Sequence, residues 1–229
     1  MALFTIADLH LSFGCDKPMD VFPGWKDYTA RLEKNWRAVV SDQDTVVIAG
    51  DISWAMKLEE TEADFSFLES LPGKKWLLKG NHDYWWTTRK KMEAYLKEKG
   101  FSSLGILFNS AEAVGDVSIC GTRGWFYDAE SDADKKVLNR EVGRLNTSIA
   151  LAKATGKEPV VFLHYPPVYG EAECQEILQV LLEQDIKQCY YGHIHGGFAA
   201  KKAVTGYYKG IDLHLISCDF TGFMPILIR

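Results

Sequence analysis

The sequence predicts an α/β fold that contains more than one β-sheet. Short apolar runs alternate with longer segments in which apolar residues recur at helical spacing, as expected for strands that alternate with amphipathic helices. Closely spaced strand-like runs interrupt this rhythm at residues 102–121 and 203–229, which indicates a second sheet. The chain has 229 residues and no linker-like segment, so we expect residues 1–229 to form a single domain.

Five short apolar runs, rich in Val, Ile, Leu or Tyr, have the composition of buried strands. They span residues 3–7, 45–49, 75–79, 160–163 and 189–191, and a turn or a polar cluster follows each of them. Ligand sites in α/β sheets form beyond the carboxyl ends of the strands. We therefore expect the five polar clusters to meet at one edge of the fold.

Four segments between these runs predict amphipathic helices. They lie around residues 32–39, 92–96, 138–152 and 177–181. Strands that alternate with such helices form a parallel or mixed sheet with helices on its outer face. Residues 122–136 form the longest apparent loop, which we expect to act as a lid or as a wall of the substrate site.

Composition and charge argue against several classes of protein. The net charge of -5 and the absence of a Lys/Arg block make nucleic acid an unlikely partner. Residues 89–100, the most basic segment, are typical of a solvated helix face; the alternative is that they attract a phosphate-bearing substrate. No apolar stretch approaches the roughly 20 residues of a membrane span, and no basic segment precedes the first strand, so we expect neither a membrane anchor nor an export signal. Five widely spaced cysteines without a C-x-x-C pair indicate reduced thiols and a cytoplasmic protein.

The polar clusters at the strand ends carry the side chains of a metal site. Asp8 and His10 are two residues apart, so both can point the same way from an extended backbone, and His193 and His195 repeat this spacing. The clusters contribute two carboxylates, one amide and four imidazoles: Asp8, His10, Asp51, Asn81, His164, His193 and His195. Such ligands without thiolate suit divalent Mn, Fe, Zn or Co. Seven ligands are too many for one zinc-like site, so the sequence predicts two divalent ions that share a bridging ligand.

The segments ADLHL, AGDIS, GNHD, LHYPP and YGHIH occur in this order between Asp8 and His195 and resemble the calcineurin-like metallophosphoesterases, a superfamily of two-metal phosphoester hydrolases. The resemblance implies a four-layer α/β/β/α sandwich of two mixed β-sheets flanked by helices. It also implies that one metal is held by Asp8, His10 and His195, that the other is held by Asn81, His164 and His193, and that Asp51 bridges them. A metal-activated water would then attack phosphorus in line with the leaving oxygen.

The resemblance leaves His82 free of the metals and facing the phosphate. There it can stabilise the equatorial charge or protonate the departing alkoxide, and Asp83 is expected to orient either His82 or the adjacent loop. Trp54 stands where the protein serine/threonine phosphatase branch has an acidic residue that supports this histidine. The departure argues against a phosphoprotein substrate.

Arg123 is the candidate arginine for binding phosphate, because it follows a strand-like run and stands near two glycines; a structural role is the alternative. Aromatic residues flank the motifs and can either stack on a base or pack the fold: Trp85, Trp86, Trp125, Tyr127 and Tyr169. They favour a nucleotide diester slightly over a broad range of monoesters.

The sequence therefore predicts a cytoplasmic, dimetal-dependent hydrolase of soluble phosphoesters, with a small-molecule or nucleotide phosphoester as its substrate. Two rivals stay open. One is a non-catalytic scaffold of the same fold, although such a protein should have lost ligands. The other is a nuclease of the same superfamily, which usually needs a basic track that this chain lacks.

Overall fold

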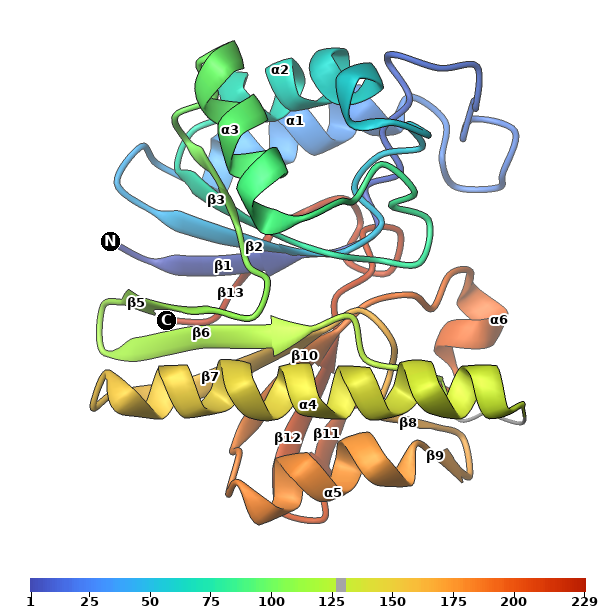
Figure 1. The fold of residues 1–229 in the computed structure, drawn as a ribbon. Helices are drawn as coiled ribbons and strands as arrows, with labels where there is room; N and C mark the ends of the chain where they lie inside the picture. Colours follow the sequence, from blue (N-terminus) through green and yellow to red (C-terminus); the bar gives the residue numbers. More distant parts are fainter. Residues whose placement is uncertain (127–130) are drawn as a thin grey trace.

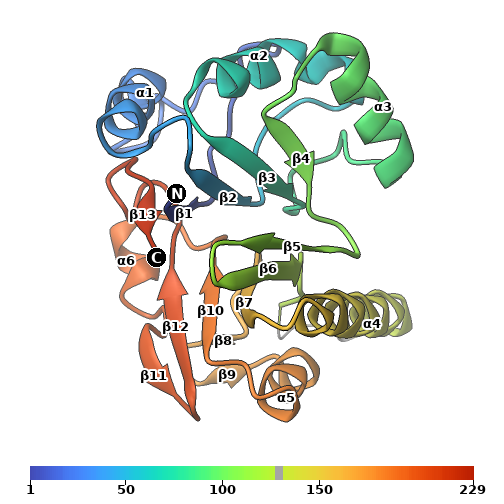
Figure 2. The same ribbon diagram turned by 90° about the vertical axis from the view of Figure 1, so that its left-hand side faces the viewer.

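A computed structural model describes residues 1–126 and 131–229 as two β-sheets packed face to face between layers of helices (Figures 1 and 2). The first sheet has the strand order β13-β1-β2-β3-β4. Its parallel strands are β1 (Leu3–Ile6), β2 (Thr45–Ala49), β3 (Lys74–Leu78) and β4 (Leu104–Ile106), and β13 (Ile226–Leu227) is antiparallel at the edge. This sheet contains three of the five predicted strands.

The second sheet has the order β11-β12-β10-β7-β6-β5. Its parallel strands are β6 (Val117–Thr122), β7 (Glu158–Leu163), β10 (Gln188–Tyr191) and β12 (Ile211–Leu215), while β5 (Ala111–Val114) and β11 (Gly206–Tyr208) are antiparallel at the two edges. A small hairpin of β8 (Val168–Tyr169) and β9 (Ala172–Glu173) stands apart. Both sheets are mixed, which confirms the predicted fold class.

The helices cover the two outer faces of the sandwich (Figure 2). The first sheet is covered by α1 (Tyr28–Val39), α2 (Glu62–Ser70) and α3 (Arg89–Lys99), and the second by α4 (Asp132–Ala154) and α5 (Gln175–Glu183). The short helices η1 (Leu58–Thr61) and α6 (Gly197–Ala200) lie in loops. No helix within the described ranges is both long enough and apolar enough to cross a bilayer.

Strand alternation divides the core into layers. In β2, Val46 and Ile48 pack toward the helices, whereas Val47 and Ala49 pack into the layer between the sheets. Phe162 of β7 lies fully buried in that middle layer and stacks on Tyr190 at 5.5 Å between ring centroids. Because a buried strand presents apolar residues on both faces, the strands are continuous hydrophobic runs.

The prediction of a loop at residues 122–136 is wrong for residues 132–136. Residues 132–136 form the first turns of α4, whose N-terminus carries a reciprocal cap: the Asp134 backbone N–H donates to Ser131 Oγ at 3.1 Å, and the Ser131 backbone N–H donates to Asp134 Oδ2 at 3.2 Å. Residues 127–130, including Tyr127, lie outside the described residues.

We predict that Phe162→Ala destabilises the protein by about 3–5 kcal/mol, because it removes a fully buried ring from the layer between the sheets. Urea denaturation measures the change. Tyr207→Ala is the control, since Tyr207 is 83% exposed and its truncation should change the free energy of unfolding by no more than about 0.5 kcal/mol. Equal effects of the two changes would contradict the assignment of the middle layer.

Candidate metal centre

The seven predicted ligands lie in the loops that follow five strands, at the edge where both sheets end. Three loops come from the first sheet, after β1, β2 and β3, and two come from the second sheet, after β7 and β10. The two sheets meet there through a parallel bridge between Ala7 and Ser217, and the backbone N–H of Ala7 donates to Ile216 O at 2.9 Å. The site is thus built between the sheets.

The backbone at four of these residues adopts a conformation that L-residues rarely take. The φ angles are 63° at Asp8, 47° at His10, 50° at Asp51 and 72° at His193. Such left-handed backbone costs roughly 1–3 kcal/mol for each residue and persists only where the surroundings impose it. Four of the nine described non-glycine residues with positive φ lie at these strand ends.

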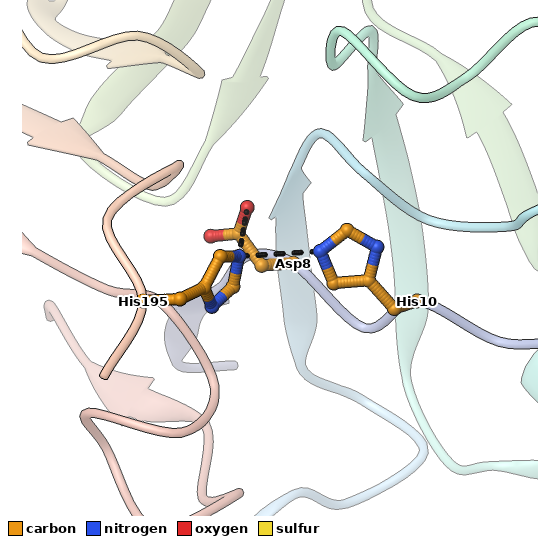
Figure 3. A group of neighbouring side chains, drawn as sticks. All are labelled: Asp8, His10 and His195. Atoms are coloured by element: carbon orange, nitrogen blue, oxygen red, sulfur yellow. Dashed lines mark hydrogen bonds and ion pairs between the residues drawn. The ribbon is translucent and has the colours of Figure 1, made fainter. Parts of the chain in front are cut away.

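Asp8, His10 and His195 form the first group of potential ligands (Figure 3). His195 Nε2 lies 3.2 Å from His10 Nε2 and 3.4 Å from Asp8 Oδ1. The other ring nitrogen of His195, Nδ1, lies 3.0 Å from Asp219 Oδ1. Since a carboxylate accepts, His195 donates from Nδ1, and its Nε2 is left to bind a metal.

Asp219 was not predicted from the sequence. It follows β12 rather than any of the five motif strands, and its second oxygen accepts a hydrogen bond from the backbone N–H of Gly196 at 2.8 Å. A carboxylate just after a strand-like run was the available signal. Nothing in the spacing linked it to a histidine 24 residues earlier in the chain.

The second group surrounds the amide oxygen of Asn81. This Oδ1 lies 2.6 Å from His164 Nε2 and 2.9 Å from His193 Nδ1. His164 Nδ1 lies 3.2 Å from the carbonyl oxygen of Ala49, to which it donates, so Nε2 is the nitrogen that faces the site. His164, His193 and Asp51 have ligand atoms close enough to hold one ion together.

Asp51 lies between the two groups. Its Oδ2 is 3.7 Å from His10 Nε2 and 3.5 Å from His164 Nε2, so a single carboxylate oxygen faces a histidine of each group. Gly80 permits this approach, because a Cβ at that position would lie only 2.1 Å from Asp51 Oδ1.

Burial and neighbouring charges shift the pKa values of the two carboxylates in opposite directions. Burial and the negative charge of Asp8 raise the pKa of Asp51. Burial also acts to raise the pKa of Asp8, but the charge and hydrogen bond of His195, with smaller contributions from His164 and His10, hold it below its ordinary value. His195 is in turn the one histidine of the site whose pKa is raised, to about 10: burial acts to lower it, but Asp8 and Asp219 outweigh that effect.

The other histidines of the site favour their neutral, metal-binding form. Burial, followed by the charge of His164, lowers the pKa of His193 to about 3. Burial also lowers the pKa of His10 and of His164. Two buried carboxylates among neutral imidazoles and an amide oxygen, with no thiolate, make a donor set that fits divalent cations.

Comparison with known proteins identifies the family. The model of the calcineurin-like phosphoesterases matches residues 1–197. The chain belongs to this family. None of the curated proteins compared matches the sequence.

Solved structures share the fold of this calcineurin-like phosphoesterase at low sequence identity. A protein of unknown function from Aquifex aeolicus is 17% identical with a TM-score of 0.54, and the match covers 99% of this chain and 95% of that one. Phosphopantetheinyl hydrolase from Mycobacterium tuberculosis is 16% identical with a TM-score of 0.52, again over 99% and 95% of the two chains. A protein from Thermus thermophilus is 11% identical with a TM-score of 0.56, over 84% and 81%. At these identities the likeness shows the fold alone.

His82 lies at the rim of the centre, half-buried. Its backbone N–H donates to Asp51 Oδ1 at 2.8 Å, and its ring packs against Trp54 at 4.5 Å between centroids. Trp54 also stacks on the ring of His10 at 4.9 Å. Trp54 therefore packs directly on His82, at the position where the serine/threonine phosphatase branch has an acidic residue.

Asp83 is buried and holds the loops after β2 and β3 together. Its carboxylate accepts hydrogen bonds from the backbone N–H groups of Gly80 at 2.7 Å, Ile52 at 2.9 Å and Asp51 at 3.0 Å, and from Trp85 Nε1 at 3.0 Å. Asp83 thus contacts the adjacent loop, and its role in orienting that loop or His82 stays a prediction. Burial and the charge of Asp51 raise the pKa of Asp83 to about 6.

The backbone of Arg123 contacts the centre, and its side chain points toward Glu141 and the ring of Trp125. Its carbonyl oxygen accepts hydrogen bonds from the backbone N–H groups of His164 at 3.1 Å and Tyr165 at 2.9 Å. Its guanidinium lies 5.0 Å from the Trp125 ring centroid, 5.9 Å from that of Tyr165 and 3.9 Å from Glu141 Oε1.

The flanking aromatics divide between core and site. Trp85 is 2% exposed and packs on Phe65 at 5.2 Å, so it fills the core. Trp86 packs on Phe108 at 5.9 Å. On the site side, Tyr169 contacts Phe126 at 6.1 Å, and Phe126 lies 5.3 Å from the ring of His193.

We predict that Asp51→Asn lowers the bound metal from two ions per chain to one or none, because it removes the carboxylate that faces both groups. Elemental analysis after removal of free metal measures the ratio, and activity should fall by at least about 100-fold. Asp185→Asn is the matched control, since the Asp185 side chain is 81% exposed and lies outside the centre. Two metals retained in Asp51→Asn would refute the bridge.

Proposed function

We propose that this protein hydrolyses small soluble phosphoesters with a pair of divalent metal ions. The observation that carries the proposal is the position of Asp51, whose Oδ2 faces His10 of one group of potential ligands and His164 of the other. Membership of the calcineurin-like phosphoesterases supports a phosphoester as the substrate.

In this proposal Asp8, His10 and His195 hold one ion, Asn81, His164 and His193 hold the other, and Asp51 contacts both. When bound, the ions supply Lewis-acid stabilisation of the phosphoryl group and make water nucleophilic near neutral pH. The chain does not then need a basic side chain to activate the water. Its own task is to hold these side chains in place, with Asp219 fixing the tautomer of His195.

His82 acts on the phosphoryl group from the rim of the centre. It either donates a hydrogen bond to an equatorial oxygen or transfers a proton to the leaving oxygen. Trp54 limits the positions that the His82 ring can take, and the hydrogen bond from the His82 backbone to Asp51 fixes His82 next to the metal centre. Asp83 acts by fixing the loops that carry Asp51 and Asn81, and Arg123 binds an anionic part of the substrate.

The substrate is a small-molecule or nucleotide phosphoester, handled in the cytoplasm. The net charge of -5 supports this choice over a long nucleic acid. All five cysteines are free, and four of them are buried, which suits a reducing compartment.

We predict that chelator-treated protein regains turnover of p-nitrophenyl phosphate or bis-p-nitrophenyl phosphate on titration with Mn, Zn, Fe, Co or Mg, because the nucleophile depends on bound ions. The preferred ester decides between a monoesterase and a diesterase. Two bound ions with no turnover of either ester would contradict hydrolysis of simple esters and favour either a more specific substrate or a scaffold that binds metal.

His82→Ala should keep both metals and lose turnover by about 100-fold or more, since general acid catalysis typically contributes that much. Comparing p-nitrophenyl phosphate with an alkyl phosphate separates the two roles of His82. A larger loss on the alkyl ester indicates proton transfer, whereas equal losses indicate stabilisation of the phosphoryl oxygens. His214→Ala removes the one histidine outside the site and should change neither quantity.

A further inference from the structure

Three cationic side chains gather around one buried carboxylate beside the second group of ligands. Lys79, Arg123 and Arg144, which we call the cationic cluster, surround Glu141 of α4, which is 1% exposed. Glu141 Oε1 accepts a hydrogen bond from Arg144 Nη1 at 2.5 Å and lies 3.9 Å from Arg123 Nη2, while Oε2 accepts from the Thr122 hydroxyl. Both oxygens of the carboxylate are therefore occupied.

Among the described residues the cluster carries more positive charge than its partners neutralise. The three cations have two neighbouring carboxylates, Glu141 and Asp83, which leaves a formal excess of one positive charge. The Nε of Arg123 is buried and has no hydrogen-bond partner within the described residues. Arg123 and Arg144 share one carboxylate. Partly buried cations whose charge is not fully compensated are costly, and an anion placed among them would offset that cost.

The cluster adjoins the metal centre through its backbone. Lys79 stands two residues before Asn81, and the carbonyl oxygen of Arg123 accepts the backbone N–H of His164 at 3.1 Å. The Arg123 guanidinium lies 5.9 Å from the ring of Tyr165, and that ring lies 4.5 Å from the ring of His193. In Figure 1 α4 runs beside β6 in the opposite direction, so its N-terminal half lies at the end of the fold where β6 ends and where the potential ligands follow their strands.

Resting on the proposed phosphoesterase function, we propose that Lys79, Arg123 and Arg144 bind a second phosphoryl group of the substrate. The substrate class is then a phosphoester that carries a further phosphate besides the one that reacts at the metals. A phosphate group would balance the excess positive charge of the cluster. Arginine forks and a lysine ammonium are the groups that bind phosphate oxygens in other proteins.

Competitive inhibition tests this inference on the metal-loaded protein, with whichever p-nitrophenyl ester it hydrolyses as the reporter substrate. Adenosine 3′,5′-bisphosphate and adenosine 5′-phosphate differ only in the second phosphate. We expect the bisphosphate to have an inhibition constant at least about tenfold lower, because it gains charge-assisted hydrogen bonds. Lys79→Met and Arg144→Met should each bring the ratio of the two constants close to one.

Matched variants separate charge from folding. Lys79→Arg keeps the cation and should retain the preference for the bisphosphate, which a loss of local structure would not allow. Arg140→Met removes an exposed arginine of the same helix and should leave both inhibition constants unchanged. Thermal melting of each variant shows that it is folded.

Equal inhibition by the two nucleotides in the parent protein would overturn the second phosphate site and leave the proposed function standing. An unchanged ratio in Lys79→Met and Arg144→Met would overturn it as well. If no metal restores turnover, the proposed function fails instead. In that case, calorimetry measures the dissociation constants of the same two nucleotides for the metal-loaded protein and its variants. The ratio of these constants replaces the ratio of the inhibition constants.

Discussion

Two carboxylates, Asp8 and Asp51, lie buried at the edge where the two sheets end, and the arrangement of the site depends on keeping them there. Burial and the charge of Asp8 oppose ionisation of Asp51, while Asp8 is kept ionised by His195. A site with two such carboxylates is electrostatically incomplete without added positive charge. In the proposed function, divalent ions would supply that charge.

The rest of the fold holds these carboxylates in place. Parallel strands bring their carboxyl ends to one edge, and the second sheet is needed because His164 and His193 follow β7 and β10. Gly80 allows Asp51 to approach closely, and Asp83 joins the loops after β2 and β3 by accepting backbone hydrogen bonds from both. Left-handed backbone at Asp8 and Asp51 is the conformational cost of aiming these side chains into the site.

The placement of the seven potential ligands could be predicted because each follows an apolar run, and strand ends must meet at one edge. The two-sheet sandwich could also be predicted, from the ordered motifs that mark the family. Contacts between distant segments could not. Asp219 reaches His195 because β10 pairs with β12. The Arg123 side chain points toward Glu141 on α4, and the first residues of this helix have a loop-like composition, so its start was not predicted. Such contacts depend on how strands and helices align in three dimensions, which spacing along the chain does not encode. That the seven residues bind two metals stays a prediction.

A crystal structure of the manganese-loaded protein, with an anomalous difference map, would locate the ions. We expect two peaks, one among Asp8, His10 and His195 and the other among Asn81, His164 and His193, with the Asp51 carboxylate contacting both ions. A single peak, or two peaks that do not share Asp51, would rule out a bridged two-metal centre.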